Sequence, residues 1–268
     1  MNITSLKLVY FSPTQTTKKV VESIAQGFQV DTVEHLDLTS PETIKGGFAE
    51  LHDELAIIGA PVYGGRVPID AVHRLRQLKA DDTPAVVVVV YGNRAYEDAL
   101  LELKTLAEEA GFKPVAGGAF IGEHSFAHET LQIANGRPDT EDLKKARAFG
   151  AMIRKKLRGI RTRDDMPPIR VPGNFPYKER SKPSKESAGT RETLCTACGT
   201  CAAVCPTGAI TVNDTVTTDP GACILCCACV KNCPTQARVM EEPRIKQLAE
   251  RLSTDFRERK EPEMYLNS

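Results

Sequence analysis

Eight of the nine cysteines fall into two copies of one pattern, and this pattern is the strongest chemical signal in the chain. In each copy three cysteines stand three residues apart, a fourth follows four residues later, and a proline comes directly after it. The two copies are Cys195, Cys198, Cys201 and Cys205 with Pro206, and Cys223, Cys226, Cys229 and Cys233 with Pro234. Spacing of this kind, C-x2-C-x2-C-x3-C-P, is typical of thiolate ligands to iron–sulfur clusters.

The spacing also predicts which cysteines share a cluster. Three thiolates at steps of three residues can surround one face of a cubane, whereas the fourth points away and reaches the other cluster. We therefore predict two [4Fe–4S] centres with crossed ligation. Cluster I is assigned to Cys195, Cys198, Cys201 and Cys233, and cluster II to Cys205, Cys223, Cys226 and Cys229.

Zinc binding and disulfide bonding are the other common uses of clustered cysteines. Zinc sites usually take two C-x2-C pairs separated by a longer loop, and disulfides are typical of secreted proteins. The first residues, MNITSLKLVYFSP, lack the apolar core of a signal peptide, so neither use explains two runs of four. Cys227 is the ninth cysteine. We expect a small buried side chain beside a cluster there, in preference to a ninth ligand or a redox thiol.

Residues 192–240 resemble bacterial-type two-cluster ferredoxins throughout. The segment is an internal repeat, in which CGTCAAVCPTGAI matches CCACVKNCPTQAR. A module of this size buries little apolar surface, so the clusters should supply much of its folding free energy.

Composition limits the remaining classes. The length of 268 residues suggests one large domain and a smaller one. The 35 basic and 35 acidic residues cancel, which gives no reason to expect nucleic acid as a partner. The longest β-branched run, 86–90, is far too short for a membrane span. Nine cysteines without an export signal favour a cytoplasmic protein whose thiolates bind metal.

Ahead of the cysteines, apolar runs that predict strands alternate with stretches of helical period. Strands are predicted at 6–11, 29–38, 55–60, 85–91 and 113–121. Helices are predicted after four of these strands, with apolar stripes that begin at Val20, Ile69, Ala99 and Leu143. This alternation indicates an α/β fold, a doubly wound parallel sheet with helices on both faces. Five strands with a specialised first turn favour the flavodoxin-like order 2-1-3-4-5, whose ligand lies at the carboxyl ends of strands 1 and 3.

The first of three candidate ligand loops follows the first strand and is rich in hydroxyl groups. Its residues are Ser12, Pro13, Thr14, Gln15, Thr16 and Thr17. Because the loop precedes a helix, free N–H groups and the helix dipole favour an anion there, although Thr16 or Thr17 could instead be a plain N-cap. The loop resembles the T-x-T-G-x-T phosphate loop of flavodoxins, with Ser12 in the first hydroxyl position and Gln15 in place of the glycine.

Two further loops resemble the flavin-flanking loops of flavodoxins. One contains Pro61, Val62, Tyr63, Gly64 and Gly65, and the other contains Tyr91, Gly92, Asn93, Arg94 and Tyr96. The resemblance implies that Tyr63 contacts the isoalloxazine ring, that Tyr96 stacks on it, and that amides near Gly92 and Asn93 bond its pyrimidine edge. Taken singly, the loops could be a Gly-Gly turn and a helix-entry turn. Their convergence at one crevice implies FMN, because a phosphate loop serves a mononucleotide.

No acid–base constellation stands out. His124, after the fifth strand, and Tyr63 are weak candidates for a proton donor, since a partly exposed loop histidine is the commoner case. The predicted divisions are a flavodoxin-like FMN-binding domain (1–159), a basic, proline-rich linker (160–190), a ferredoxin module (191–240), and an amphipathic helix with a frayed tail, EPEMYLNS (241–268). The linker could be solvated, or it could lie against an acidic partner or the cluster module.

As a whole, the chain resembles fused flavodoxin-type and two-cluster ferredoxin proteins of anaerobic bacteria and archaea. The fusion implies electron transfer through FMN and two [4Fe–4S] clusters to a redox partner protein, since clusters exchange single electrons and flavin exchanges one or two. The alternative is an oxidoreductase that reduces a small organic acceptor such as a quinone or nitro compound. A reductase should enclose a pocket over the flavin ring, whereas a carrier should leave the ring edge open. In a homodimer the clusters could face the flavin of a neighbouring chain.

Overall fold

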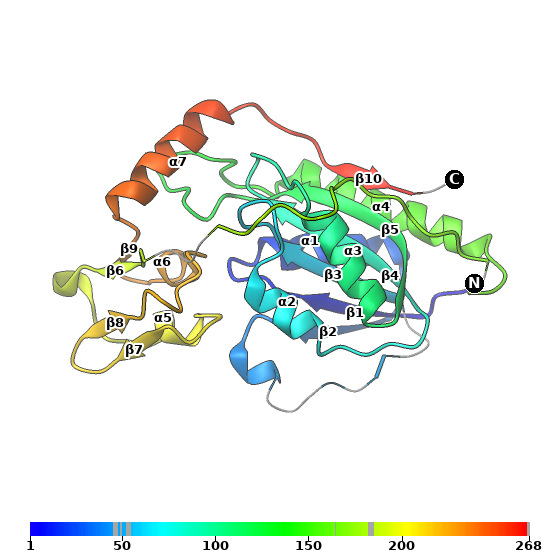
Figure 1. Ribbon diagram of the computed structural model, residues 1–268, viewed down its shortest axis with the longest axis horizontal. Coiled ribbons are helices and arrows are strands. Elements are labelled where there is room, and N and C mark those ends of the chain that lie inside the picture. Colours follow the sequence, from blue (N-terminus) through cyan, green and yellow to red (C-terminus); the bar gives the residue numbers. More distant parts are fainter. Residues whose placement is uncertain (45–47, 49, 52–54, 164, 182–184, 267–268) are drawn as a thin grey trace.

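The computed structural model describes residues 1–44, 48, 50–51, 55–163, 165–181 and 185–266. Its centre is a sheet of five parallel strands, drawn from blue to green in Figure 1. The strands are β1 (Ser5–Tyr10), β2 (Thr32–Asp37), β3 (Leu55–Pro61), β4 (Thr83–Tyr91) and β5 (Phe112–Ile121). Their order across the sheet is β2-β1-β3-β4-β5, so the predicted α/β fold and strand order are confirmed.

Two helices cover each face of this sheet, because successive strand side chains enter two separate apolar cores. One face carries α1 (Thr16–Phe28) and α4 (Thr140–Arg158), and the other carries α2 (Ile69–Leu75) and α3 (Ala99–Glu109). A 3₁₀ turn, η1 (Pro41–Ile44), follows β2. Helices α1 and α4 approach closely at Gly27, where an added Cβ would lie 2.1 Å from the Arg147 carbonyl oxygen. Ile69, expected to begin an apolar stripe, is exposed at the first position of α2.

A sixth strand, which the sequence did not lead us to expect, completes the sheet. β10 (Glu263–Tyr265) pairs antiparallel with β5, with Met264 opposite Gly118. The expectation that the tail EPEMYLNS is frayed is therefore wrong for its described part, which ends at residue 266. An unpaired β5 would present a row of backbone N–H and C=O groups at the sheet edge, and β10 pairs with this edge from Gly117 to Ala119.

The cysteine-rich module lies to one side of the sheet (Figure 1, left) and consists of short strand pairs and single helical turns. Its elements are β6 (Gly189–Thr190) paired with β9 (Arg238–Val239), β7 (Ile210–Val212) paired with β8 (Val216–Thr218), η2 (Glu192–Leu194), α5 (Thr200–Ala203) and α6 (Ala228–Lys231). Left-handed φ values recur at equivalent positions of the two halves, namely Ala197 and Leu225, Gly199 and Cys227, and Gly208 and Gln236. The repeat in the sequence is therefore also a repeat of backbone conformation.

After the module, the chain returns to the sheet domain through the predicted amphipathic helix, α7 (Pro243–Asp255). Its Ala249 and Leu252 pack with Ala127 and Ile133 of the segment that follows β5. The segment after α7 is held by Asn93, whose side-chain amide donates to the carbonyl oxygens of Phe256 at 2.6 Å and Glu258 at 2.7 Å. Both ends of the module are thus attached to the sheet domain.

The described part of the linker, which excludes 164 and 182–184, lies against the sheet domain. Ile169 is buried in the core on the α3 side of the sheet. The Asp98 carboxylate accepts hydrogen bonds from the backbone N–H groups of Asn174 at 2.8 Å and Lys178 at 2.7 Å. Arg180 pairs with Glu102 at 2.6 Å. Acidic groups at the start of α3 therefore hold the linker.

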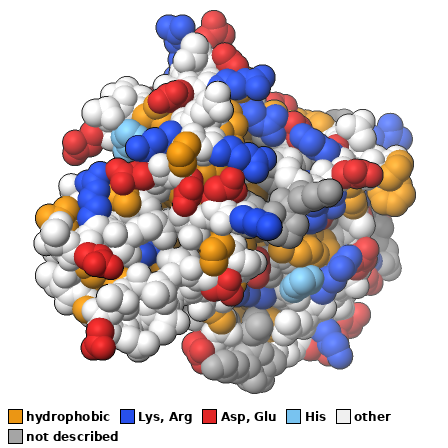
Figure 2. Space-filling view, turned by 60° about the vertical axis from the view of Figure 1, so that its left-hand side comes forward, with side chains coloured by type: hydrophobic (Ala, Val, Ile, Leu, Met, Phe, Trp, Pro, Cys, Tyr) orange, Lys and Arg blue, Asp and Glu red, His pale blue; other side chains and the backbone are white. Residues whose placement is uncertain are grey.

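Further side chains join the module to the sheet domain. Arg74 of α2 is buried and donates to the carbonyl oxygens of Leu38 and Thr39, each at 2.6 Å, and to that of Pro206 in the module. Lys231 of α6 pairs with a glutamate that follows β5. On the face of the molecule drawn in Figure 2, Lys and Arg side chains are interspersed with Asp and Glu, as the equal totals of both charges suggest.

Replacing Asp98 with Ala should free the linker and destabilise the protein. The substitution removes a buried carboxylate that accepts three hydrogen bonds from Asn174 and Lys178, so we expect a loss of about 2–4 kcal/mol in the free energy of unfolding in urea. Limited proteolysis should then cut within 160–190. Asp214→Ala, at an exposed turn of the module, is the control and should change neither measurement.

The contribution of Asp98 should also depend on pH. Burial alone would raise the pKa of Asp98, but hydrogen bonds from Lys178 and Asn174 outweigh it and lower the pKa below its usual value. The stabilisation is therefore complete above the pKa of the unfolded chain, about 3.9, and is lost as the pH falls through the folded-state pKa. Equal stability of the wild type and Asp98→Ala at neutral pH would contradict this role.

Candidate functional site

Cavity I is a small space in the module that is lined by the four cysteines predicted for cluster I. They are Cys195, Cys198, Cys201 and Cys233. The first three belong to one run, and Cys233 comes from the end of the other. Arg238 and Val216 are among the other residues that line it.

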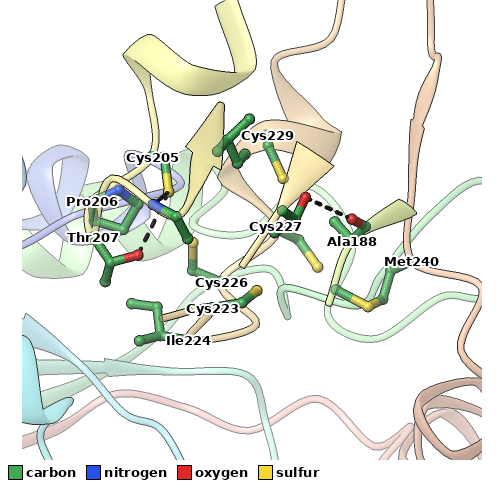
Figure 3. A pocket seen from close by; sticks show the side chains of 13 residues that line it. Ala188, Cys205, Pro206, Thr207, Cys223, Ile224, Cys226, Cys227, Cys229 and Met240 are labelled. Atoms are coloured by element: carbon green, nitrogen blue, oxygen red, sulfur yellow. Dashed lines mark hydrogen bonds between the residues drawn. The ribbon is translucent and has the colours of Figure 1, made fainter. Parts of the chain in front are cut away.

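Cavity II is lined by the other set, Cys205, Cys223, Cys226 and Cys229, as Figure 3 shows. Its other walls are mostly apolar and include Ile210, Ile224 and Met240. The structure therefore brings the eight cysteines together in the two crossed groups that the spacing predicts.

The surroundings of the sulfur atoms suit iron–sulfur clusters. The N–H groups of Ala209 and Ala237 donate to the Sγ atoms of Cys205 at 3.3 Å and Cys233 at 3.2 Å, at equivalent places in the two halves. Such bonds stabilise the thiolate form and tune clusters. Burial raises the pKa of Cys226 to about 12, so a bound metal is needed to keep that thiol ionised. Among the described residues, no three or more His, Cys, Asp or Glu side chains are grouped closely enough to hold one metal ion, so each four-cysteine group is a candidate site for a cluster and not for a single ion.

Cys227 lies in the wall of cavity II but takes a different role from its neighbours. It is 3% exposed, and its φ of 57° places it in the left-handed region, where the other half has Gly199 with φ 79°. Its Sγ faces the Leu225 carbonyl oxygen at 3.8 Å, a weak contact. Burial raises the pKa of Cys227 well above its usual value, so the thiol is neutral. These surroundings suit the small buried side chain that we expected.

A larger cavity, which we call the crevice, lies at the carboxyl ends of β1, β3, β4 and β5. Its volume is about 850 Å³, within the range of cofactor and ligand pockets. All three predicted loops reach it. The predicted residues that line it are Thr14, Thr16, Pro61, Val62, Tyr63, Gly64, Tyr91, Gly92, Arg94 and His124.

The first loop is shaped for an anion. Gln15 has φ 64°, the left-handed conformation for which the phosphate motif uses glycine, so the replacement preserves the turn. Ser12 Oγ accepts the Lys18 N–H at 3.0 Å and fixes the start of α1. Thr17 Oγ1 is buried and has no hydrogen-bond partner in the described protein. A buried hydroxyl without a partner beside a helix N-terminus fits a missing phosphate contact.

Several predicted residues lie outside the crevice. The expectation that Tyr96 stacks on a flavin ring is wrong, because its hydroxyl bonds Glu263 Oε2 and Tyr265 Oη, both at 2.8 Å, and its ring packs in the α3-side core. The Asn93 side chain turns to the segment after α7, and Gly65 packs against Glu97. Tyr96, which sequence reasoning assigned to the cofactor, therefore bonds residues of strand β10 instead.

The structure also adds walls that sequence reasoning missed. Helix α7 contributes Arg244, Leu248 and Arg251 to the crevice, and the loop between two ligands of cavity II contributes Ile224 and Leu225. The amphipathic pattern of α7 predicted that one face of this helix packs against the protein, but it did not indicate which segment that face contacts. A signal for the loop was present, since CILC carries two large apolar residues where the first run, CTAC, has small ones.

Neither candidate proton donor is poised to titrate near neutral pH. Burial lowers the pKa of His124 to about 4. His124 Nδ1 accepts the Phe126 N–H at 3.1 Å, so the neutral ring carries its proton on Nε2. Burial raises the pKa of Tyr63 well above its usual value.

Two parts of the chain are similar to known proteins. Residues 190–211 match the protein family described as 4Fe-4S binding domain. Similar solved structures include a flavodoxin from the domain Archaea, with 16% identity, 57% of this chain and 99% of that chain covered, and a TM-score of 0.37. Oxidised flavodoxin 1 from Bacillus cereus has 18% identity, 56% and 97% coverage, and a TM-score of 0.39. A search of curated proteins found no match.

The strand order and the family match together define a fusion of a flavodoxin-like domain with a 4Fe–4S-binding module. Among the described residues, no helix has the length and apolar character that crossing a membrane requires.

Replacing Cys205 with Ala tests the crossed grouping. Because Cys205 lines cavity II, the substitution should impair the cluster held with Cys223, Cys226 and Cys229 and spare the other. Iron and sulfide content should fall by roughly half from about eight of each per chain, and EPR of the reduced protein should lose one of two signals. Cys227→Ala is the matched control and should retain both clusters. Loss of only the cluster in cavity I would contradict the grouping.

Proposed function

We propose that this protein is a flavo-iron–sulfur electron-transfer protein, which binds FMN in the crevice and two [4Fe–4S] clusters in cavities I and II. It relays electrons between the clusters and the flavin, and on to a redox partner protein in the cytoplasm. When bound, the clusters exchange single electrons and FMN exchanges one or two. One observation carries the proposal: Ile224, between ligands Cys223 and Cys226, lines both cavity II and the crevice.

The residues between these two sites include apolar side chains. Ile224 and Leu225 are apolar and face the crevice, and Tyr63 stands on its wall close enough to Cys226 for the thiol to affect its pKa. A protein-filled boundary with low polarity supports electron exchange between neighbouring redox groups without a solvent gap. The chain itself thus supplies the contact between its two modules.

The order of the sites follows from shared residues. Cavity II touches the crevice through Ile224, and Arg238 of cavity I reaches Cys229 of cavity II. The electron route would therefore run through cavity I, then cavity II, then the crevice, all within one chain. A homodimer is not needed for this route. Cavity I is the end at which a protein partner would exchange electrons, since Cys198 there is exposed.

FMN binding in the crevice is supported by the fit of the loops. Thr14 and Thr16 line the crevice and would hold the phosphate at the N-terminus of α1, together with Thr17, whose buried hydroxyl lies outside the crevice lining. Tyr63 and Tyr91 would flank the ring. Gly92 packs against His124, where an added Cβ would lie 2.3 Å from Cδ2, so backbone rather than side chain faces the crevice at this point.

A second function, reduction of a small organic acceptor, is favoured by α7. Leu248, Arg251 and Leu252 of this helix form one side of the crevice, so the flavin site is partly covered as a terminal reductase requires. The electron-transfer role remains the better supported, because a reductase needs a proton donor. The pKa of His124 is lowered to about 4, so its ring is neutral at neutral pH and carries no extra proton to donate. The pKa of Tyr63 is raised well above its usual value, which makes its hydroxyl a weak acid.

Thr17→Val tests FMN binding, because the substitution should raise the stability of the flavin-free protein and lower its affinity for FMN. Removing a buried hydroxyl that has no partner should stabilise the flavin-free protein by about 1 kcal/mol, yet weaken FMN binding by roughly ten-fold, as expected for a lost phosphate contact. Flavin fluorescence quenching gives the affinity, and urea unfolding gives the stability. Thr83→Val is the control, because the buried Thr83 hydroxyl already donates to Leu51. It should destabilise the protein and leave FMN affinity unchanged. Recovery of FAD, or no binding of FMN, would refute the flavin assignment.

Cys198→Ala tests the route of electrons. The substitution should remove the cluster in cavity I and slow reduction of bound flavin by a low-potential donor protein by an order of magnitude or more, since the outer end of the route is lost. Rapid mixing with the flavin absorbance as readout measures this rate. Cys227→Ala, with both clusters retained, should reduce its flavin as the wild type does. Equal rates in Cys198→Ala and wild type would show that the clusters only stabilise the module.

A further inference from the structure

One buried side chain breaks the symmetry of the cysteine-rich module. The stretch after each run reads CPTGAI in the first half and CPTQAR in the second, so Ile210 and Arg238 occupy equivalent positions. Both are buried, with Ile210 8% and Arg238 2% exposed. Since an isoleucine suffices for packing in the first half, packing alone does not explain a guanidinium in the second.

Arg238 lies between the two cavities. Its Nη1 donates to Thr190 Oγ1 at 2.5 Å, and its Nη2 donates to the Ala188 carbonyl oxygen at 2.8 Å and Thr218 Oγ1 at 2.7 Å. Nη2 also lies 4.0 Å from Cys229 Sγ in cavity II. Its Nε is buried without a partner in the described protein, and the residue lines cavity I.

The charge of Arg238 needs a negative counterpart. Its hydrogen-bond partners within the described residues are neutral hydroxyl and carbonyl oxygens, and a buried guanidinium that meets only neutral groups is unfavourable. The negative groups that it faces are the cysteine sulfurs of both cavities.

We propose that Arg238 is a counter-charge shared by the two clusters: its Nε–H donates to the cluster in cavity I, and its guanidinium charge lies beside the Cys229 thiolate in cavity II, with Nη2 4.0 Å from Cys229 Sγ. Each cluster becomes more negative when it gains an electron from the donor. A fixed cation beside both therefore stabilises both reduced states and raises both reduction potentials. The inference rests on the clusters of the proposed function and is independent of FMN.

Arg238→Gln in the complete, cluster-loaded protein tests the charge. EPR-monitored redox titration should show that both cluster potentials shift to more negative values. Arg191→Gln is the matched control, since it removes the same charge from a half-exposed residue of the module that pairs with Glu241 at 2.5 Å. It should leave both potentials in place. Unchanged potentials in Arg238→Gln, or equal shifts in the two variants, would overturn the proposal.

A measurement on the wild type covers the case in which Arg238→Gln fails to assemble its clusters. Protein grown with arginine labelled by ¹⁵N in the guanidinium group should show a weak ¹⁵N hyperfine coupling in pulsed EPR of the reduced cluster in cavity I. Arg238→Lys, which keeps the charge and removes the Nε–H, should lose this coupling and shift the potential of cluster I more than that of cluster II. Absence of the coupling in the wild type overturns the hydrogen bond to cluster I.

Iron and sulfide analysis of the wild type separates the two levels of inference. A chain that binds no clusters refutes the proposed function, and with it any role for Arg238. Loaded clusters with potentials that do not respond to Arg238→Gln refute the role of Arg238 alone.

Discussion

Buried thiolates are the constraint on which the cysteine-rich module depends. Burial penalises the charged form, as the pKa of about 12 for Cys226 shows, and a module with so few apolar residues cannot compensate through its core. Metal binding favours the thiolate and so becomes part of folding. Because Cys205 and Cys233 each lie in the cavity formed by the other run, neither half can complete its site alone. In the proposed function, crossed ligation would couple the two halves into one folding unit, and the short loop between Cys223 and Cys226 would remain free to face the crevice.

The loop between Cys223 and Cys226 can line the crevice only if the module has a fixed position relative to the sheet domain. Segments before and after the module fix this position. Before the module, the linker is held by Asp98 at the start of α3; after it, α7 packs beside the crevice and β10 joins the edge of the sheet. Arg74 adds a direct link, because one guanidinium bonds the end of β2 and Pro206 in the module. A charged, proline-rich segment that could have been a flexible tether instead runs along the sheet domain. Close placement therefore comes from packing at several points rather than from tethering alone.

Features that depend on local chemistry could be predicted from the sequence, whereas features that depend on distant partners could not. The cysteine groups follow from ligand spacing, and the five parallel strands follow from apolar periodicity. Tyr96 was misassigned because its position after β4 says nothing of Glu263 and Tyr265, which reach it from the other end of the chain. The same non-local pairing turns the tail into a strand. The wall formed by Ile224 had a visible signal in the apolar pair of CILC, but its significance depends on where the module docks.

The crevice combines two features that point to different uses, and the handling of protons distinguishes them. Coverage by α7 resembles a substrate pocket, yet the two candidate proton donors at its wall keep their protonation states across the neutral range. Desolvation lowers the pKa of His124 to about 4 and raises the pKa of Tyr63 well above its usual value. A site that reduces an organic acceptor must deliver protons together with electrons. A site that exchanges electrons with neighbouring clusters benefits instead from fixed charges and apolar walls, such as those of Ile224 and Leu225. In the proposed electron-transfer role, helix α7 would be a cover that limits access of solvent to the flavin, and the module would keep the electronic contact through cavity II.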